Sequence, residues 1–353
     1  MTGFEIAGRK IGLSEPPFVI AEMSGNHNQS LDRALAMVDM AAEAGADAIK
    51  LQTYLPETIT LDASTSDFLV PDDSPLWQGR RLFDLYDEAH TPWEWHLPIF
   101  ERARQKGIIA FSSAFDETSV DFLESIGAPA YKIASFELTH IPLIRKVAGT
   151  GKPVIISTGM AVREEIAEAL EACRDAGNQQ VAILKCTSAY PAPTHDANVL
   201  TIPDMRATYG CEVGISDHTM GCGVSIAAVA HGASIIEKHF TSARADGGVD
   251  AAFSMEPDEF SILATEARRA WEALGEVRYG RSESDKNSLR YRRSIYFSRA
   301  LPAGSVISRD DVRIVRPGFG LPPKHLDSVI GAVTTRPVNI GDRVTWEIIM
   351  TPG

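Results

Sequence analysis

Two histidines attract attention by their spacing and context. The chain carries "GISDHTMG" at 214–221 and "IIEKHF" at 235–240, so His218 and His239 both close short apolar runs about one strand–helix unit apart. Neutral imidazoles suit Mn, Fe, Co or Zn, and two of them leave the open coordination positions with which a Lewis acid polarises a carbonyl. The pattern predicts either a divalent metal site or a structural, hydrogen-bonding pair.

Two lysines suggest a neighbouring anion site. Lys50 in AIKLQTY and Lys132 in AYKIAS lie within apolar runs that also end in small hydroxyl residues. A buried lysine is costly unless it is paired, so the two together predict a ligand with several oxygens, of which phosphate fits best. The alternative is that they form structural ion pairs with Glu22 or Glu137.

The elements that must position these groups recur along the chain. Helical stretches separate short β-rich runs, and the helical pattern of SLDRALAMVDMAAEAG stops at a glycine, Gly45. The runs begin at Pro17, Ala48, Ile108, Ala130, Val154, Val181, Glu212 and Ser234. About eight such units close a (β/α)₈ barrel, in which reactive side chains gather at the C-terminal ends of the strands.

Strand periodicity then predicts which side chains face the barrel mouth. Residues two apart share a face, so Lys50 with Gln52, and Glu237 with His239, should point inward, while Lys238 points outward. The stretch from 55 to 91 is too long for an ordinary loop, and its helical pattern GRRLFDLYDEAH favours an active-site cover.

The rest of the sequence indicates the domain organisation of the protein and excludes some kinds of partner. We expect a barrel domain at 1–280, a polar linker at 281–293 and a small β-rich module at 294–353. A net charge of −13 argues against nucleic-acid and anionic-membrane partners, and no apolar stretch reaches the roughly 20 residues of a membrane span. The start lacks a signal-peptide pattern, so a cytoplasmic protein is expected, and its four cysteines are interpreted as buried thiols without a role.

The motifs, in this order, resemble a known family. AEMSGNHNQS, AYKIASFEL, VIISTGM, LKCTSAYP, GISDHTMG and EKHF follow one another as in sialic acid synthases, and VRPGFGLPP resembles their C-terminal antifreeze-like (SAF) domain. Within that family, KLQTY, FSSAF and KIASFE resemble the pseudaminic acid synthases. The resemblance implies an α/β fold, a (β/α)₈ TIM barrel followed by a small β-rich SAF domain of the β-clip type.

The resemblance also implies an activity. It is the condensation of phosphoenolpyruvate with an acylamino sugar, here 2,4-diacetamido-2,4,6-trideoxy-L-altrose, and water, giving pseudaminate and phosphate through carbon–oxygen cleavage. A divalent metal (Mn, Mg or Co) and a domain-swapped homodimer belong to the same expectation. The alternatives are an N-acetylneuraminate or legionaminate synthase, a Schiff-base aldolase that uses a strand lysine such as Lys185, and a non-catalytic sugar-binding module.

Roles follow by matching motifs to the family. His218 and His239 are implied to be metal ligands and catalytic, with Glu22 or Glu137 transferring a proton. The groups implied around phosphoenolpyruvate are Lys50, Ser113, Lys132, Ser135, Ser157, Ser188 and Ser216. Those implied to face the sugar are Glu22, Gln52, Phe115, Glu137, Tyr190 and Asp250. Arg316 is implied to reach the acylamino group from the SAF domain of the partner chain. Ser113 and Ser188 stand where the family usually has threonine and asparagine, and both keep a hydrogen-bonding group.

Overall fold

The structure is a computed structural model that describes residues 3–71 and 76–351. Residues 1–2, 72–75 and 352–353 lie outside the described residues; they belong to the ends of the two predicted domains and to the predicted cover. The chain divides after Gly275 into two compact units. The sequence prediction placed the end of the barrel domain five residues later, at 280.

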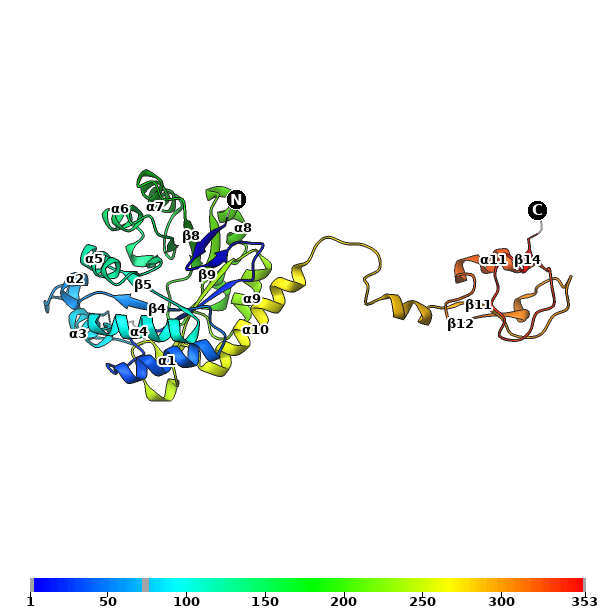
Figure 1. Ribbon diagram of the computed structural model, residues 1–353, viewed down its shortest axis with the longest axis horizontal. Helices are drawn as coiled ribbons and strands as arrows, with labels where there is room; N and C mark the ends of the chain where they lie inside the picture. Colours follow the sequence, from blue (N-terminus) through cyan, green and yellow to red (C-terminus); the bar gives the residue numbers. More distant parts are fainter. Residues whose placement is uncertain (1–2, 72–75, 352–353) are drawn as a thin grey trace. The chain divides into compact units, whose positions relative to one another are not determined.

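The first unit is the predicted barrel (Figure 1). Eight parallel strands of the described chain pair in sequence order, and the last closes the ring by pairing with the first. They are β3 (Phe18–Glu22), β4 (Ala48–Thr53), β5 (Ile109–Ala114), β6 (Tyr131–Ile133), β7 (Val154–Ser157), β8 (Val181–Cys186), β9 (Glu212–Ser216) and β10 (Ile235–His239). Each β-rich run of the sequence therefore forms one strand.

Helices follow the strands and surround them (Figure 1). They are α1 (Leu31–Glu43), α4 (Trp93–Lys106), α5 (Glu117–Ser125), α6 (Ile141–Gly149), α7 (Arg163–Asp175), α8 (Thr201–Tyr209), α9 (Gly223–Ala230) and α10 (Pro257–Leu274). The first of them shows why they form here. Ser30 caps it by accepting a hydrogen bond from the Arg33 amide, and Ala34, Met37, Val38 and Ala41, at helical spacing, are buried against the strands.

Strand alternation separates two apolar cores. Phe18, Phe111 and Leu184 point into the barrel, and their neighbours along each strand pack outward under the helices. The hairpin of β1 (Phe4–Ile6) and β2 (Arg9–Ile11) adds Ile6 and Ile11 to the inner core. Apolar side chains thus fill the N-terminal part of the barrel, and the polar strand ends gather at its C-terminal mouth.

The long insertion after β4 contains α2 (Pro56–Ile59), the 3₁₀ turn η1 (Ser66–Phe68) and α3 (Leu82–Ala89). Gln29 donates hydrogen bonds to the Glu88 and His90 carbonyls at 2.9 and 2.8 Å. The Trp77 indole N–H donates to the Val249 carbonyl at 3.0 Å. These bonds tie the described part of the insertion to the loops that follow β3 and β10, on the mouth side of the barrel.

Short 3₁₀ turns complete the loops of this unit. They are η2 (Ser135–Glu137), η3 (Thr194–Ala197), η4 (Arg244–Asp246) and η5 (Ala251–Phe253). The turn η2 carries Ser135 and Glu137, which the sequence assigned to the substrate site. The turn η5 directly follows Asp250, another of those residues.

The second unit is small and β-rich, as predicted. It contains η6 (Lys286–Tyr291), β11 (Ser294–Phe297), η7 (Arg309–Asp311), β12 (Val312–Val315), η8 (Pro323–His325), α11 (Leu326–Val329), β13 (Val333–Thr334) and β14 (Ile349–Met350). β11 pairs with β12 and β13 with β14, both antiparallel, around its own apolar core. Among the residues described in both units, every helix is too short or too polar to cross a bilayer.

Candidate active site

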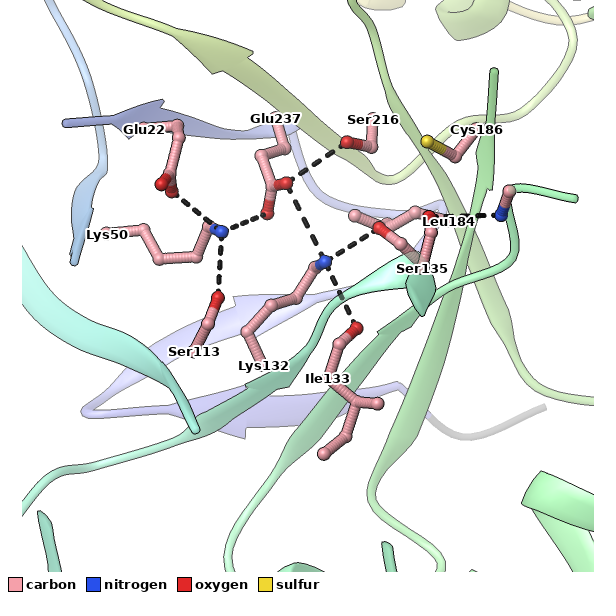
Figure 2. Close-up of polar contacts among 12 residues, drawn as sticks. Glu22, Lys50, Ser113, Lys132, Ile133, Ser135, Leu184, Cys186, Ser216 and Glu237 are labelled. Carbon is pink, nitrogen blue, oxygen red and sulfur yellow. Dashed lines mark hydrogen bonds and ion pairs between the residues drawn. The ribbon is translucent and has the colours of Figure 1, made fainter. Parts of the chain in front are cut away.

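Two buried lysines, on strands β4 and β6, point toward one carboxylate, that of Glu237, at the barrel mouth (Figure 2). Lys50 Nζ lies 2.7 Å from Glu22 Oε2 and donates to Ser113 Oγ at 3.0 Å. Lys132 Nζ donates to a second hydroxyl, that of Ser157, at 2.7 Å. Glu237 reaches both lysines, at 3.6 Å from Lys50 and 3.7 Å from Lys132.

The charges in this cluster are interdependent. Burial raises the pKa of Glu22 to about 7, with a further rise from the nearby charge of Glu237, although Lys50 opposes the shift. Burial also acts on Glu237, but the two lysines outweigh it and hold its pKa below the usual value. Burial lowers the pKa of Lys132, which has no carboxylate as close as Glu22 is to Lys50. The cluster can therefore take up one proton near neutral pH, which would favour the entry of a multiply charged anion.

A row of hydroxyl groups extends the cluster along the mouth. Ser135 Oγ accepts the Gly159 amide at 3.1 Å, and Ser216 Oγ donates to Glu237 at 3.1 Å. A β-carbon at Gly159 would lie 2.1 Å from Ser188 Oγ and 2.8 Å from Ser135 Oγ. A side chain there would therefore force both hydroxyl groups to move, because the backbone passes directly over them.

The two histidines lie on neighbouring strand ends, with ring centroids 5.3 Å apart. His218 Nδ1 is 2.9 Å from the Thr187 carbonyl, so this nitrogen carries the proton and Nε2 keeps its lone pair. Burial lowers the pKa of His239 well below its usual value and keeps the ring neutral. Its Nδ1 is buried and has no hydrogen-bond partner in the described chain. Burial lowers the pKa of His218, but Cys186 and the Thr187 carbonyl outweigh it and raise that pKa, so His218 would bind a divalent cation through Nε2 after losing a proton.

Remaining ligands for such a cation would come from outside the protein. In the described ranges, no group of three or more His, Cys, Asp or Glu side chains is arranged to hold a metal ion. The Asp250 carboxylate accepts a hydrogen bond from Ser24, and one of its oxygens lies 3.7 Å from His239 Nδ1. Two protein ligands leave positions for water and substrate oxygens.

Aromatic and amide groups surround the histidines and the acids. The Tyr190 ring lies 4.5 Å from that of His218, between centroids. Gln52 donates to Glu22 at 3.0 Å, and Phe115 packs edge-on against Tyr54 at 5.2 Å. Burial raises the pKa of Glu137 to about 7, and one of its oxygens, also buried, finds no hydrogen-bond partner in the described chain.

Two sequence candidates lie elsewhere. Ala182 and Leu184 point into the barrel, so Lys185 points outward, where its Nζ donates to the Cys186 carbonyl at 3.0 Å. This orientation removes Lys185 from the mouth and counts against the Schiff-base alternative. Arg316 belongs to the second unit, in which its side chain is exposed.

Sequence reasoning gave no role to two residues of the mouth. Glu237 was expected to point inward, but nothing in one strand's sequence shows that it reaches the lysines of two others. Cys186 was grouped with the other cysteines, although it lies two residues beyond the inward Leu184. Burial raises its pKa, but a contact with His218 at 3.9 Å and the nearby Lys132 lower it to about 7. The period-two pattern already predicts the inward direction of Glu237, and the same pattern applied to β8 would have found Cys186.

Comparison with known proteins identifies the family. The NeuB family profile matches residues 37–279, and the SAF domain profile matches residues 292–350. The chain is 40% identical to the pseudaminic acid synthase of Campylobacter jejuni subsp. jejuni, over 92% of this chain and 94% of that protein. It is 34% identical to the N,N'-diacetyllegionaminic acid synthase of Legionella pneumophila, over 96% of each chain.

A solved structure agrees with these sequence matches. The N-acetylneuraminic acid (sialic acid) synthetase from Leptospira borgpetersenii, solved in complex with citrate, superposes with a TM-score of 0.72. The two chains are 33% identical, and the match covers 82% of this chain and 96% of that one. A barrel with a polar mouth, the profile match and relatives of this similarity lead to one conclusion: the chain belongs to the NeuB family and carries a C-terminal SAF domain.

Proposed function

We propose that this protein is a pseudaminic acid synthase. It joins C3 of phosphoenolpyruvate to the aldehyde carbon of 2,4-diacetamido-2,4,6-trideoxy-L-altrose, and a water oxygen bonds to C2. The bond between C2 and the bridging oxygen then breaks, and phosphate leaves with that oxygen. The observation that carries the proposal is the pair of buried lysines beside two histidines on neighbouring strand ends, because it suits an anion and an electrophile held side by side.

Phosphoenolpyruvate is recognised by charge and hydroxyl groups. Lys50 and Lys132 neutralise its phosphate and carboxylate, while Ser113 and Ser157, already bonded to these lysines, turn toward the same oxygens. Ser135, Ser188 and Ser216 complete the row of hydroxyl donors. Since these groups are fixed before substrate arrives, they stabilise the charge that builds up on the departing phosphate.

Proton transfer falls to a carboxyl group with a pKa near neutrality. Glu137 has a pKa of about 7 because burial outweighs the attraction of Lys132 and Lys50. Burial and the nearby Glu137 charge raise the pKa of Tyr86 in the insertion. Glu137 can take a proton from the attacking water and return it at the collapse of the tetrahedral intermediate. Glu22, with a similar pKa, remains the second candidate.

A divalent metal, Mn, Mg or Co, supplies Lewis acidity to the sugar aldehyde when it is held by His218 and His239. Tyr190 and Phe253 cover the imidazoles from the side, with ring centroids 5.2 Å apart. Gln52, Phe115 and Asp250 are left to orient the sugar. Arg316 contacts the acylamino group from the SAF domain of a partner chain in a domain-swapped homodimer.

Two alternative functions are set beside this proposal, and a cellular location is proposed with it. Relatives named for legionaminic and neuraminic acids support a different acceptor sugar as the first alternative. A non-catalytic sugar-binding module is the second. The free cysteines of the described chain are typical of a reducing compartment and support a cytoplasmic location.

A phosphate-release assay tests the proposal. Phosphoenolpyruvate is supplied with the acceptor sugars for pseudaminate, legionaminate and N-acetylneuraminate, each with Mn²⁺ and after exhaustive chelation. We expect turnover with the first sugar, at least about tenfold above the others in kcat/KM, and its loss on chelation. No release with any sugar would favour the binding module, and full activity after chelation would remove the metal.

Labelled substrate and variants test the details. Phosphoenolpyruvate with ¹⁸O in the bridging position should give labelled phosphate, and unlabelled phosphate would contradict carbon–oxygen cleavage.

Glu137→Gln should remove an ionisation near pH 7 from the kcat profile, whereas an unchanged profile would assign the proton to Glu22. Arg316→Ala should raise the KM of the sugar far more than that of phosphoenolpyruvate. Mixed dimers of Arg316→Ala chains with His218→Ala chains should regain activity if each site is shared between two chains.

A further inference from the structure

A second buried ion pair lies on the outer side of the same two strand ends. Asp217 and Lys238 directly precede His218 and His239, so alternation turns them away from the mouth and toward the helices. Lys238 Nζ lies 2.9 Å from Asp217 Oδ2, and the two side chains are 1% and 0% exposed. The pair therefore joins two neighbouring strand ends behind the two histidines.

The Asp217 carboxylate is fully occupied by donors. One oxygen accepts the Thr219 amide and hydroxyl at 2.9 and 2.7 Å. The other accepts Ser225 Oγ of α9 at 2.7 Å as well as Lys238. Lys238 also donates to the Thr219 carbonyl at 2.5 Å. The loop after β9, the start of α9 and the end of β10 are thus held at one point.

This point lies just beyond the last paired residues of β9 and β10. Strand pairing between β9 and β10 ends at Ser216 with Glu237, and the Asp217 amide makes one further bond to the Glu237 carbonyl. His239 remains on a paired strand, in register with Glu22. His218 follows the end of its strand and is held by a bond from the Ala192 amide to its carbonyl and by its contact with the Thr187 carbonyl. Both of these partners belong to the loop after β8, so neither fixes its distance from His239.

We propose that Asp217 and Lys238 are positioning residues that set the separation of the His218 and His239 side chains. The inference rests on the proposed function, because the divalent metal of that function is what the separation serves. An apolar pair of similar size could fill the same space without the desolvation penalty of two charges, but it would not fix the loop after β9 by directional bonds. Groups behind metal ligands typically change metal affinity by about 10-fold to 100-fold when they are removed.

The test measures binding of Mn²⁺ alone, from the loss of the free Mn²⁺ EPR signal, and so does not depend on turnover. Lys238→Met should weaken Mn²⁺ binding by about 10-fold to 100-fold. The double variant Asp217→Asn with Lys238→Met should lose less stability toward urea than the single variant, because it buries no unpaired charge and keeps an acceptor for Thr219, yet bind Mn²⁺ as weakly. Ser225→Ala, which removes one donor to Asp217, provides a milder change and should weaken binding about threefold.

Arg206→Met is the matched control. Arg206 and Glu212 form another buried pair at the opposite end of β9, with a distance of 2.7 Å. This variant should lose stability as Lys238→Met does while keeping wild-type Mn²⁺ affinity. Wild-type affinity in Lys238→Met and Ser225→Ala, or an equal loss in Arg206→Met, would overturn the inference alone. A wild-type protein that binds no Mn²⁺ would overturn the metal assignment and this inference together.

Discussion

The inner and outer faces of the same barrel strands use polar side chains differently. On the inner face, Lys50, Lys132 and Glu237 share charges at distances up to 3.7 Å. On the outer face, Thr53 bonds the Ser112 hydroxyl group at 2.6 Å and the His96 ring at 2.7 Å, and all three are fully buried. Neighbouring positions of one strand thus have different roles. The inward side chains line the mouth, and the outward ones bond to a neighbouring strand and to α4.

The difference lies in what remains unpaired. Glu137 Oε2 and His239 Nδ1 at the mouth have no hydrogen-bond partner within the described residues. A buried polar atom without a partner costs about 1–3 kcal/mol, which a bound ligand can return. The inner face therefore holds binding capacity at the expense of stability, and the outer face holds the strand ends in place.

The largest effect should come from an inner lysine. Lys132→Met should lower kcat/KM for phosphate release by about 10³-fold or more, because a preorganised charge on the phosphate is lost. The free energy of unfolding should change by less than about 2 kcal/mol, since Glu237 keeps Lys50 as a partner.

Lys185→Met provides the control for that variant. It makes the same substitution at an outward-pointing position of another strand, β8. This variant should leave kcat/KM within about threefold of wild type. A comparable loss of activity in both variants would break the distinction between the two faces.

The next effect concerns pH and an outer histidine. Burial lowers the pKa of His96 to about 4. Between about pH 6.5 and 4 the unfolded chain binds a proton at this residue and the folded chain does not, so stability falls as the pH falls. The contribution is about 3 kcal/mol, and His96→Gln, which keeps a hydrogen-bonding group, should flatten the dependence by that amount. Urea unfolding of both proteins at several pH values measures it, and identical slopes would show that His96 is not the source.

A smaller effect is expected at Thr53. Thr53→Val keeps the shape but leaves Ser112 and His96 without their shared hydroxyl group, so the free energy of unfolding should fall by about 2 kcal/mol. Turnover should stay within about threefold of wild type. A variant that unfolds normally but loses most activity would place this outer cluster in the catalytic machinery instead.

The smallest effect should lie on the outermost layer. Arg102 of α4 binds the Asp39 carboxylate of α1 through two guanidinium nitrogens, in partial contact with solvent. Arg102→Ala should lower the free energy of unfolding less than Thr53→Val does, and 1 M salt should shrink the difference. A loss as large as that of Thr53→Val would mean that burial does not rank these contacts.

Much of this contrast can be predicted from the sequence, because period-two alternation acts within one strand. The inward Lys50 and the outward Lys238 follow from it, and the eight strands follow from the β-rich runs between helical stretches. The meeting of Glu237 with two lysines does not, because it depends on the stagger between strands that are far apart in the sequence. Phe115 lies beyond the end of its strand, where alternation no longer applies, and its place came from family resemblance alone.

The close approach of Gly159 to two serine hydroxyl groups restricts how this protein can evolve. With Ser135 and Ser188 in their present rotamers, a β-carbon at position 159 lies too close to both hydroxyl oxygens, so a substitution there requires both serine side chains to move. Changes at the two serines are restricted in turn, since a longer side chain at either must avoid the same stretch of backbone. We therefore expect the effects of substitutions at these three positions on phosphate release to be non-additive in double-mutant cycles.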